Sequence, residues 1–200
     1  MNPVVAEQPA RKQGVWVIGI GASAGGIGSL IELLSSVPKS LPACFVVVLH
    51  LSPDHKSFLA EILGRYSKMT VKEAENNDLV RPGVVYIAPP NAHVTVVHNR
   101  LRLGLEPPVD WHRPSIDLLF ESIAFEFKER GIGIILSGSG RDGSDGLRVL
   151  KAAGGSTLVQ DPHEASFSSM PTHGIDTGCV DYVVPVKEIA ARLSSLCPTN

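Results

Sequence analysis

The sequence predicts an α/β fold: a doubly wound, mainly parallel sheet with helices on both faces and an antiparallel hairpin, in a single domain. Continuous apolar runs at residues 15–20 (VWVIGI), 44–49 (CFVVVL) and 132–136 (IGIIL) are typical of strands buried on both faces. Each run leads into a stretch with helical apolar spacing, at residues 27–34, 58–66 and 147–153. Strands that alternate with helices in this way form parallel sheets with right-handed crossovers.

The middle of the chain departs from this alternation. Residues 84–88, 94–97 and 101–105 are strand-like, and His98-Asn99-Arg100 joins the last two runs. This pattern predicts an antiparallel hairpin inserted into the parallel sheet or lying beside it. Pro114-Ser115 then opens a predicted helix with one apolar face, formed by Ile116, Leu119, Phe120, Ile123 and Phe127.

The C-terminal part returns to the alternation. Residues 157–159 and 182–184 predict two further strands, and residues 189–196 predict a closing helix. We expect one domain over residues 15–196, preceded by a flexible lead-in or linker at residues 1–14.

Composition narrows the function classes. The chain has 200 residues, of which 44% are hydrophobic and 19% charged, which indicates a substantial core. A net charge of −2 provides no basic field for nucleic acid or anionic lipid. The three cysteines show no C-x-x-C spacing, and Cys44 lies in an apolar run, so a reducing compartment is expected. No signal peptide is evident and no apolar stretch reaches the roughly 18 residues of a membrane span, so we expect a cytoplasmic protein.

Gly21-Ala22-Ser23-Ala24-Gly25 is the first candidate for chemistry. It matches the G-x-S-x-G nucleophile elbow and has the strand–turn–helix context that this motif requires. Two other interpretations remain: a small residue in a turn or helix N-cap, and a dinucleotide-binding G-x-G-x-x-G/A motif over residues 19–24. The dinucleotide interpretation requires an acidic residue at the end of the second strand, where this chain has His50.

His50 is the second candidate, because it directly follows the strand predicted to lie beside the Ser23 strand. A histidine at that edge could accept the proton of the Ser23 hydroxyl as a general base. A purely structural histidine is the alternative, and the other six histidines fit the role of base less well. A metal site built from His50, Asp54 and His55 is conceivable, but its spacing matches no zinc pattern.

Asp142 is the third candidate. It lies in the Gly-rich segment 137–143 (SGSGRDG), directly after a predicted strand. The segment lacks the Gly-Lys-Ser/Thr of a phosphate-binding loop but supplies a carboxylate that could orient the histidine. Asp145 is a rival for this role, although its place in the next helix also suits an N-terminal charge.

These blocks together resemble the catalytic domain of the CheB-type chemotaxis methylesterases. The resemblance covers residues 15–196 and follows the order of the family's signature blocks. The first three blocks are residues 19–26 (GIGASAGG), 49–51 (LHL) and 137–143 (SGSGRDG). Further matches are residues 113–117 (RPSID), 150–155 (LKAAGG), 160–162 (QDP) and 170–171 (MP).

The resemblance implies a serine esterase that needs no metal or cofactor. Ser23 would be the nucleophile, His50 the general base and Asp142 its orienting carboxylate, with backbone N–H groups of Ala24 and Ser139 as the oxyanion hole. The family hydrolyses glutamate γ-methyl esters on the cytoplasmic helices of chemoreceptors, and some members also deamidate glutamine. The methylated receptor is thus the expected partner. The alternative is a catalytically idle module of the same fold that binds a receptor or another signalling protein.

Three positions depart from the common family pattern, which has Thr, Gln and Met where this chain has Ala24, Leu49 and Ser139. Ala24 and Ser139 resemble the methylesterase modules fused to a receptor methyltransferase, so a fused or separate methyltransferase is a further expected partner. Many members also carry an N-terminal receiver domain. With the first strand predicted near residue 15, we expect constitutive activity, and we consider the hairpin and the loop around Arg113 as receptor contacts. The alternative is that the hairpin only covers a sheet edge.

Overall fold

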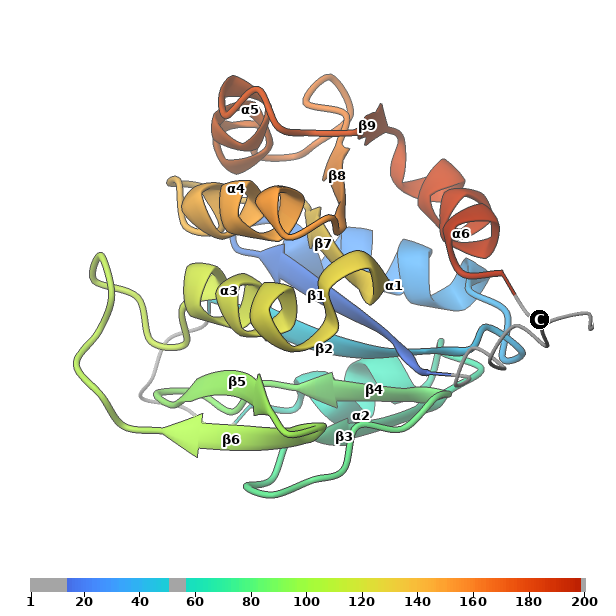
Figure 1. Ribbon diagram of the computed structural model, residues 1–200. Coiled ribbons are helices and arrows are strands. Elements are labelled where there is room, and N and C mark those ends of the chain that lie inside the picture. Colours follow the sequence, from blue (N-terminus) through green and yellow to red (C-terminus); the bar gives the residue numbers. More distant parts are fainter. Residues whose placement is uncertain (1–13, 51–56, 199–200) are drawn as a thin grey trace, which may run out of the picture.

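The computed structural model describes residues 14–50 and 57–198, and a parallel seven-stranded sheet forms its centre (Figure 1). All neighbouring strands of this sheet pair in parallel, which confirms the predicted fold class. Across the sheet the strands are β3 (Thr70–Glu73), β4 (Val84–Ile87), β2 (Ala43–Leu49), β1 (Trp16–Ala22), β7 (Gly131–Ile135), β8 (Ser156–Gln160) and β9 (Tyr182–Val184).

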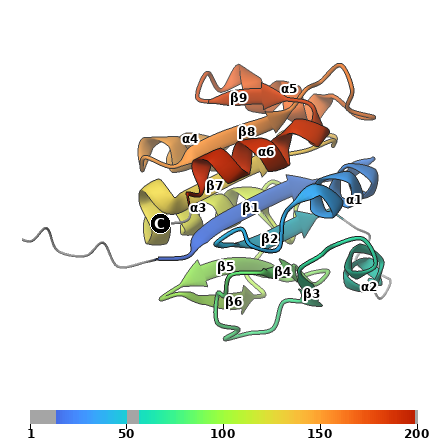
Figure 2. The same ribbon diagram turned by 90° about the vertical axis from the view of Figure 1, so that its right-hand side faces the viewer.

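Helices cover both faces of the sheet (Figure 2). One face packs against α1 (Gly26–Ser36), α2 (Leu59–Gly64) and α6 (Val186–Leu196). The other packs against α3 (Ile116–Phe127), α4 (Ser144–Ala152) and α5 (Ser169–Asp176), and a short 3-10 helix (Lys128–Arg130) follows α3. Strand side chains alternate between the two cores, so Ile18 and Ile20 face the first and Val17 the second. Within residues 14–50 and 57–198, no helix combines the length and hydropathy needed to span a bilayer.

The predicted hairpin forms from β5 (His93–Val97) and β6 (Arg100–Gly104), and it makes a separate two-stranded sheet. Its turn is His98-Asn99, with positive φ at both residues, as a two-residue hairpin turn requires. The hairpin packs on α3 rather than along an edge strand of the large sheet. Its buried side chains share the core of α3, and the backbone N–H of Val96 donates to Ser122 Oγ on that helix (3.0 Å).

Gly19 and Gly21 lie inside β1, on the face that α3 covers. A Cβ at Gly21 would come within 2.5 Å of the Ile116 side chain, and one at Gly19 within 2.9 Å of the Phe120 ring. These two glycines therefore make room for α3. A dinucleotide motif places its glycines in the turn after the strand, so this packing removes the basis of the dinucleotide interpretation.

The strand order reverses between β1 and β7, because β2 lies on one side of β1 and β7 on the other. Open α/β sheets bind ligands beyond the carboxyl ends of the strands at such a point. Ala22 pairs with Leu49 at the ends of β1 and β2, so Ser23 and His50 are the first residues beyond two adjacent strands. The segment with Asp142 follows β7, the other neighbour of β1. All three predicted side chains therefore come from loops at one edge of the sheet.

Candidate active site

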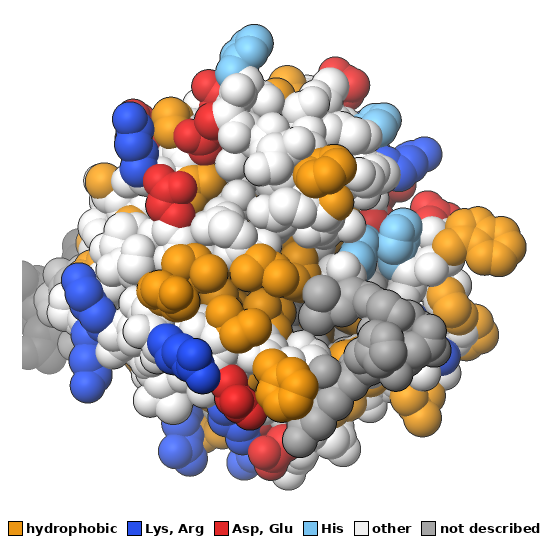
Figure 3. Space-filling view, turned by 180° about the vertical axis from the view of Figure 1, so that it is seen from behind, with side chains coloured by type: hydrophobic (Ala, Val, Ile, Leu, Met, Phe, Trp, Pro, Cys, Tyr) orange, Lys and Arg blue, Asp and Glu red, His pale blue; other side chains and the backbone are white. Residues whose placement is uncertain are grey.

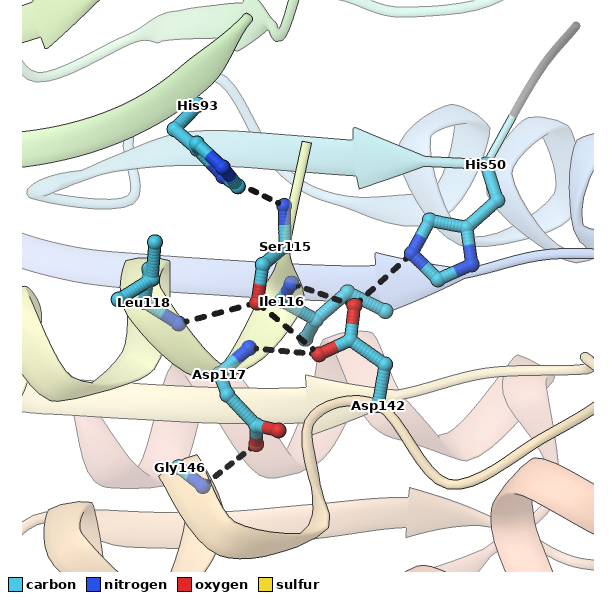
Figure 4. Close-up of polar contacts among 8 residues, drawn as sticks. All are labelled: His50, His93, Ser115, Ile116, Asp117, Leu118, Asp142 and Gly146. Carbon is cyan, nitrogen blue, oxygen red and sulfur yellow. Dashed lines mark hydrogen bonds and ion pairs between the residues drawn. The ribbon is translucent and has the colours of Figure 1, made fainter. Parts of the chain in front are cut away.

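His50 and Asp142 are in direct contact at this edge (Figure 4). The Nε2 atom of His50 lies 2.9 Å from Asp142 Oδ2, and their side chains are 13% and 2% exposed. The contact joins residues that are 92 positions apart in the sequence. The adjacent acid, Asp145, points elsewhere, because its half-exposed carboxylate pairs with Arg141 and Arg148. Of the two acidic candidates, Asp142 is therefore the one that contacts His50.

Asp142 is held by the N-terminus of α3. Its Oδ2 accepts the backbone N–H of Ile116 (2.8 Å), and its Oδ1 accepts that of Asp117 (3.0 Å) and the hydroxyl of Ser115 (3.2 Å). Burial alone would raise the pKa of Asp142. The hydrogen bonds from His50 and from the two N–H groups outweigh burial, and the pKa lies below its usual value. Asp142 is therefore ionised at neutral pH and fixed in orientation.

The ionised carboxylate determines the tautomer of His50. Because it can only accept hydrogen bonds, Nε2 carries the proton and Nδ1 keeps a free lone pair. His50 Nδ1 is buried and has no hydrogen-bond partner among the described residues. The lone pair of Nδ1 is thus left free on a residue that directly follows β2, the neighbour of β1.

Ser23 begins the turn between β1 and α1. Its backbone N–H donates to Ser137 O (3.1 Å), and the N–H of His50 donates to Ala22 O (3.1 Å), which ties the turn to both neighbouring strands. Within the described parts of the chain, no hydrogen bond involves the partly buried Ser23 hydroxyl. A nucleophile elbow usually holds its serine in a strained turn, and this strain is not found here. Ser23 has no positive φ, and Gly25 takes the left-handed conformation (φ 75°) as the N-cap of α1.

The two N–H groups proposed for an oxyanion hole follow β1 and β7. Among the described residues, neither the N–H of Ala24 nor that of Ser139 has a hydrogen-bond acceptor, whereas the N–H groups of Ser23 and Gly138 are used within the fold. Ala24 also lies one residue before the N-cap of α1, where the helix dipole favours negative charge. Both groups are therefore available to an oxyanion near Ser23.

Ser137 joins the loops around this site, a role that the sequence did not reveal. Its buried hydroxyl donates to Ala24 O (2.9 Å) and accepts the N–H of Phe167 (3.0 Å). Its N–H donates to Gln160 Oε1 (2.7 Å) at the end of β8. One serine thereby connects the segments that follow β1, β7 and β8.

Asp117 and Asp142 link α3 and α4 in both directions. Asp142, just before α4, caps α3, while Oδ1 of Asp117 in α3 accepts the N–H of Gly146 in α4 (2.7 Å; Figure 4). Burial raises the pKa of Asp117, and the negative charge of Asp142 raises it further against the opposing effect of the Gly146 N–H. The two helix N-termini are thus fixed by carboxylates that share one region of negative potential.

His112 is the main site residue that sequence reasoning missed. Its ring stacks on His50, with centroids 4.2 Å apart and planes 15° from parallel. Burial lowers the pKa of His112, and the neighbouring His50 lowers it further, although Asp142 and Asp110 oppose this. His112 directly precedes the block Arg113-Pro114-Ser115. The match of that block to the family was the one sequence feature near His112 that indicated a functional region.

His50, His112 and Asp142 form a group of possible metal ligands among the described residues, with ligand atoms within 4.8 Å of one another. Stacked rings do not direct their in-plane lone pairs to one point, and both Asp142 oxygens already accept hydrogen bonds. The arrangement therefore suits proton transfer better than metal binding. The other metal site considered from the sequence includes Asp54 and His55, which lie outside the described residues.

Exposed hydrophobic side chains occur around this edge. Ile27 lies in the first turn of α1 and Phe167 follows β8, and they are 39% and 48% exposed, while Trp111 beside His112 is 98% exposed. A view from behind shows hydrophobic side chains gathered in the middle of one face, with histidines at the top and toward the right (Figure 3). A polar site with an apolar rim suits a substrate whose reacting group is uncharged.

Comparison with known proteins is consistent with this geometry. A family model described as CheB methylesterase matches residues 18–193. A protein-glutamate methylesterase/protein-glutamine glutaminase 2 of Anaeromyxobacter dehalogenans is 42% identical over 188 residues, which is 94% of this chain and 55% of that protein. A relative of the same name from the group 3 operon of Rhizobium meliloti is 35% identical over 95% of this chain and 54% of its own length.

The fold also matches a solved structure. The crystal structure of the Thermotoga maritima CheB methylesterase catalytic domain superposes with a TM-score of 0.87 and 34% sequence identity, over 92% of this chain and 99% of that one. The chain thus spans about half the length of the two named relatives and nearly all of this catalytic domain.

Proposed function

The chain belongs to the CheB methylesterase family, and on this basis we propose that it hydrolyses γ-methyl esters of glutamate side chains on the cytoplasmic helices of chemoreceptors. The observation that carries the proposal is the His50–Asp142 pair beside Ser23, at the edge of the sheet where β1, β2 and β7 end. The product would be a free carboxylate on the receptor together with methanol. Such a reaction would adjust receptor output in chemotaxis-like signalling.

In the proposed mechanism Ser23 Oγ attacks the ester carbonyl while His50 Nδ1 takes its proton. Asp142 stabilises the imidazolium that forms, through its contact with Nε2. The N–H groups of Ala24 and Ser139 would bind the oxyanion of the tetrahedral intermediate. The intermediate collapses, the bond to the methoxy group breaks, and methanol leaves with the proton from His50.

The resulting acyl-enzyme is then hydrolysed. His50 takes a proton from water, the hydroxide attacks the acyl carbon, and Ser23 leaves with the proton. The same steps applied to glutamine would release ammonia, so glutamine deamidation is part of the proposal, as the names of the two relatives suggest. Besides the substrate and water, the proposed steps use side chains and N–H groups of this chain.

Receptor membranes with tritium-labelled methyl esters test the proposal. We expect volatile labelled methanol to appear in proportion to the amount of protein added. A receptor with glutamine at the same positions should lose ammonia and gain about 1 Da per site, visible by mass spectrometry. Binding to the membranes without release of methanol or ammonia would contradict the proposal and support the idle binding module.

A further inference from the structure

Asp142 alone does not fix the ring of His50. Their hydrogen bond holds one atom, Nε2, and an imidazole held at one atom can still turn about that contact. The last side-chain torsion of histidine is broad, so the side chain itself provides little restraint. A second contact is needed to fix the plane of the ring and therefore the direction of Nδ1.

The stack with His112 provides a contact of that kind. The two rings are 15° from parallel with centroids 4.2 Å apart, so one face of His50 rests on a flat partner. Rotation of His50 out of its plane would require its ring edge to enter the space of His112. The ring plane is therefore defined by a hydrogen bond at one end and a surface along one face.

The backbone before His112 holds it in a tight turn. Val109 and His112 exchange both of their backbone hydrogen bonds (3.1 and 2.8 Å) across Asp110 and Trp111. Both central residues have positive φ, 45° and 69°, in a region that bulky side chains rarely adopt. Trp111 is 98% exposed, so packing of its side chain does not explain this conformation. Unfavourable backbone of this kind is concentrated at functional sites.

The residue after His112 is anchored as well. Arg113 donates through Nε and Nη2 to Asn91 Oδ1 (2.9 and 2.6 Å) and through Nη1 to the carbonyl oxygens of Leu105 and Glu106 (3.1 Å each). His112 thus lies between a closed turn and an anchored arginine, and the hydrogen bonds on both sides fix the position of its backbone.

We propose that His112 is a positioning residue, whose ring face keeps the imidazole of His50 in the plane that directs Nδ1 to Ser23. The inference rests on the proposed function and deepens it. The ring nitrogens of His112 have no part in this role, and its Nδ1 has no hydrogen-bond partner among the described residues. A neutral ring suits the role, since His50 becomes positively charged during the reaction and a second charge would oppose that step.

Two variants of similar size test whether His50 needs the flat face of the His112 ring or only its volume. His112→Phe keeps a flat ring without nitrogen atoms, and His112→Leu keeps the volume without the flat face. On a soluble methyl ester we expect His112→Phe to stay within about threefold of the wild-type kcat. We expect His112→Leu to lower kcat by on the order of ten- to hundredfold with little change in KM, because small misplacements of a catalytic group have effects of this size. Equal loss in both variants, no loss in either, or a change in KM alone would overturn the proposal.

Nitrogen-15 NMR of the His50 ring gives a second measurement that does not depend on turnover. Wild type and His112→Phe should show one tautomer with the proton on Nε2, and His112→Leu should show exchange between tautomers or ring orientations. A His112→Leu spectrum identical to that of wild type would overturn the proposal. The wild type could release no methanol while the His50 ring of His112→Leu exchanges between orientations in the NMR spectrum. In that case the proposed function fails and the positioning role of His112 stands.

Discussion

His50 Nε2 lies 2.9 Å from Asp142 Oδ2, so the nitrogen left for Ser23 is Nδ1. In the serine proteases the carboxylate contacts Nδ1 and the serine proton moves to Nε2. In this chain the two ring nitrogens would exchange these roles, so the carboxylate contacts Nε2 and the serine proton would move to Nδ1. The arrangement follows from the fold, because His50 comes from the strand next to Ser23 while Asp142 is fixed across the site by the N-terminus of α3.

Asp142→Asn should lower kcat/KM on a small methyl ester by on the order of 10⁴, the size of the equivalent loss in the proteases, because an amide does not impose the required tautomer. Asp145→Asn is the matched control and should have little effect, since that carboxylate is half exposed and pairs with Arg141 and Arg148 rather than with His50. Adding Asp142→Asn to Ser23→Ala should change little further. A fully additive double variant, or a larger loss from Asp145→Asn, would assign the carboxylate differently.

Ser137→Ala should lower both stability and turnover. The hydroxyl connects Ala24 O with the N–H of Phe167, and leaving buried backbone groups unpaired costs about 1–3 kcal/mol. We expect a melting temperature lower by several degrees and a kcat reduced by on the order of tenfold. The control is Ser139→Ala, which removes an exposed hydroxyl but retains the N–H proposed for the oxyanion. Equal effects from both variants would contradict the role given to Ser137.

Asp117→Asn should make stability less dependent on pH. The folded-state pKa of Asp117 is raised, so the folded protein binds this proton more tightly than the unfolded chain does. Its contribution is complete below the unfolded pKa of about 4 and is lost as the pH rises through the folded pKa. Relative to wild type, the asparagine variant should gain on the order of 1 kcal/mol between pH 5 and pH 8. Urea unfolding at pH 5 and at pH 8 measures this free energy for both proteins. A difference in stability between variant and wild type that is the same at the two pH values would contradict the raised pKa of Asp117.

Arg113→Ala should reduce turnover on receptor membranes and on a small ester alike, by on the order of tenfold, since Arg113 anchors the loop that carries His112. The sequence suggested Arg113 as a receptor contact, and its hydrogen bonds within the chain now favour a structural role. Arg100→Ala in the hairpin is the comparison and should retain activity on the small ester. If Arg113→Ala lost activity on membranes alone, the docking interpretation would return.

Most of the fold could be predicted because its strands are apolar runs and its long helices have one apolar face. All five side chains chosen for the buried face of α3 are buried. Three elements were not predicted: β3, α5 and the short 3-10 helix after α3. β3 is four residues long, and none of them is fully buried, so it carries no apolar run and depends on pairing with β4. α5 contains Pro171 and Gly174, which disfavour helix in isolation, and it is stabilised by packing through Met170.

The sequence could predict only those site residues that directly follow the strands of the sheet. Ser23, His50 and Asp142 follow three neighbouring strands of a parallel sheet, so their proximity follows from topology. The approach of His112 to His50 depends on a turn at Asp110-Trp111, which lacks the asparagine or glycine that usually indicates such turns. The role of Ser137 depends on loops meeting across the sheet, and no spacing in the sequence encodes that contact.

The role of Ser23 as nucleophile can be tested by comparing methanol release from methyl-labelled receptor membranes by wild type and by Ser23→Ala. The substitution removes a hydroxyl that has no hydrogen bond among the described residues, so the variant should fold and melt like the wild type. We expect its release rate to fall by on the order of 10⁴-fold or more, as for other nucleophilic serines. A folded Ser23→Ala protein that kept more than about a tenth of the wild-type rate would contradict Ser23 as the nucleophile.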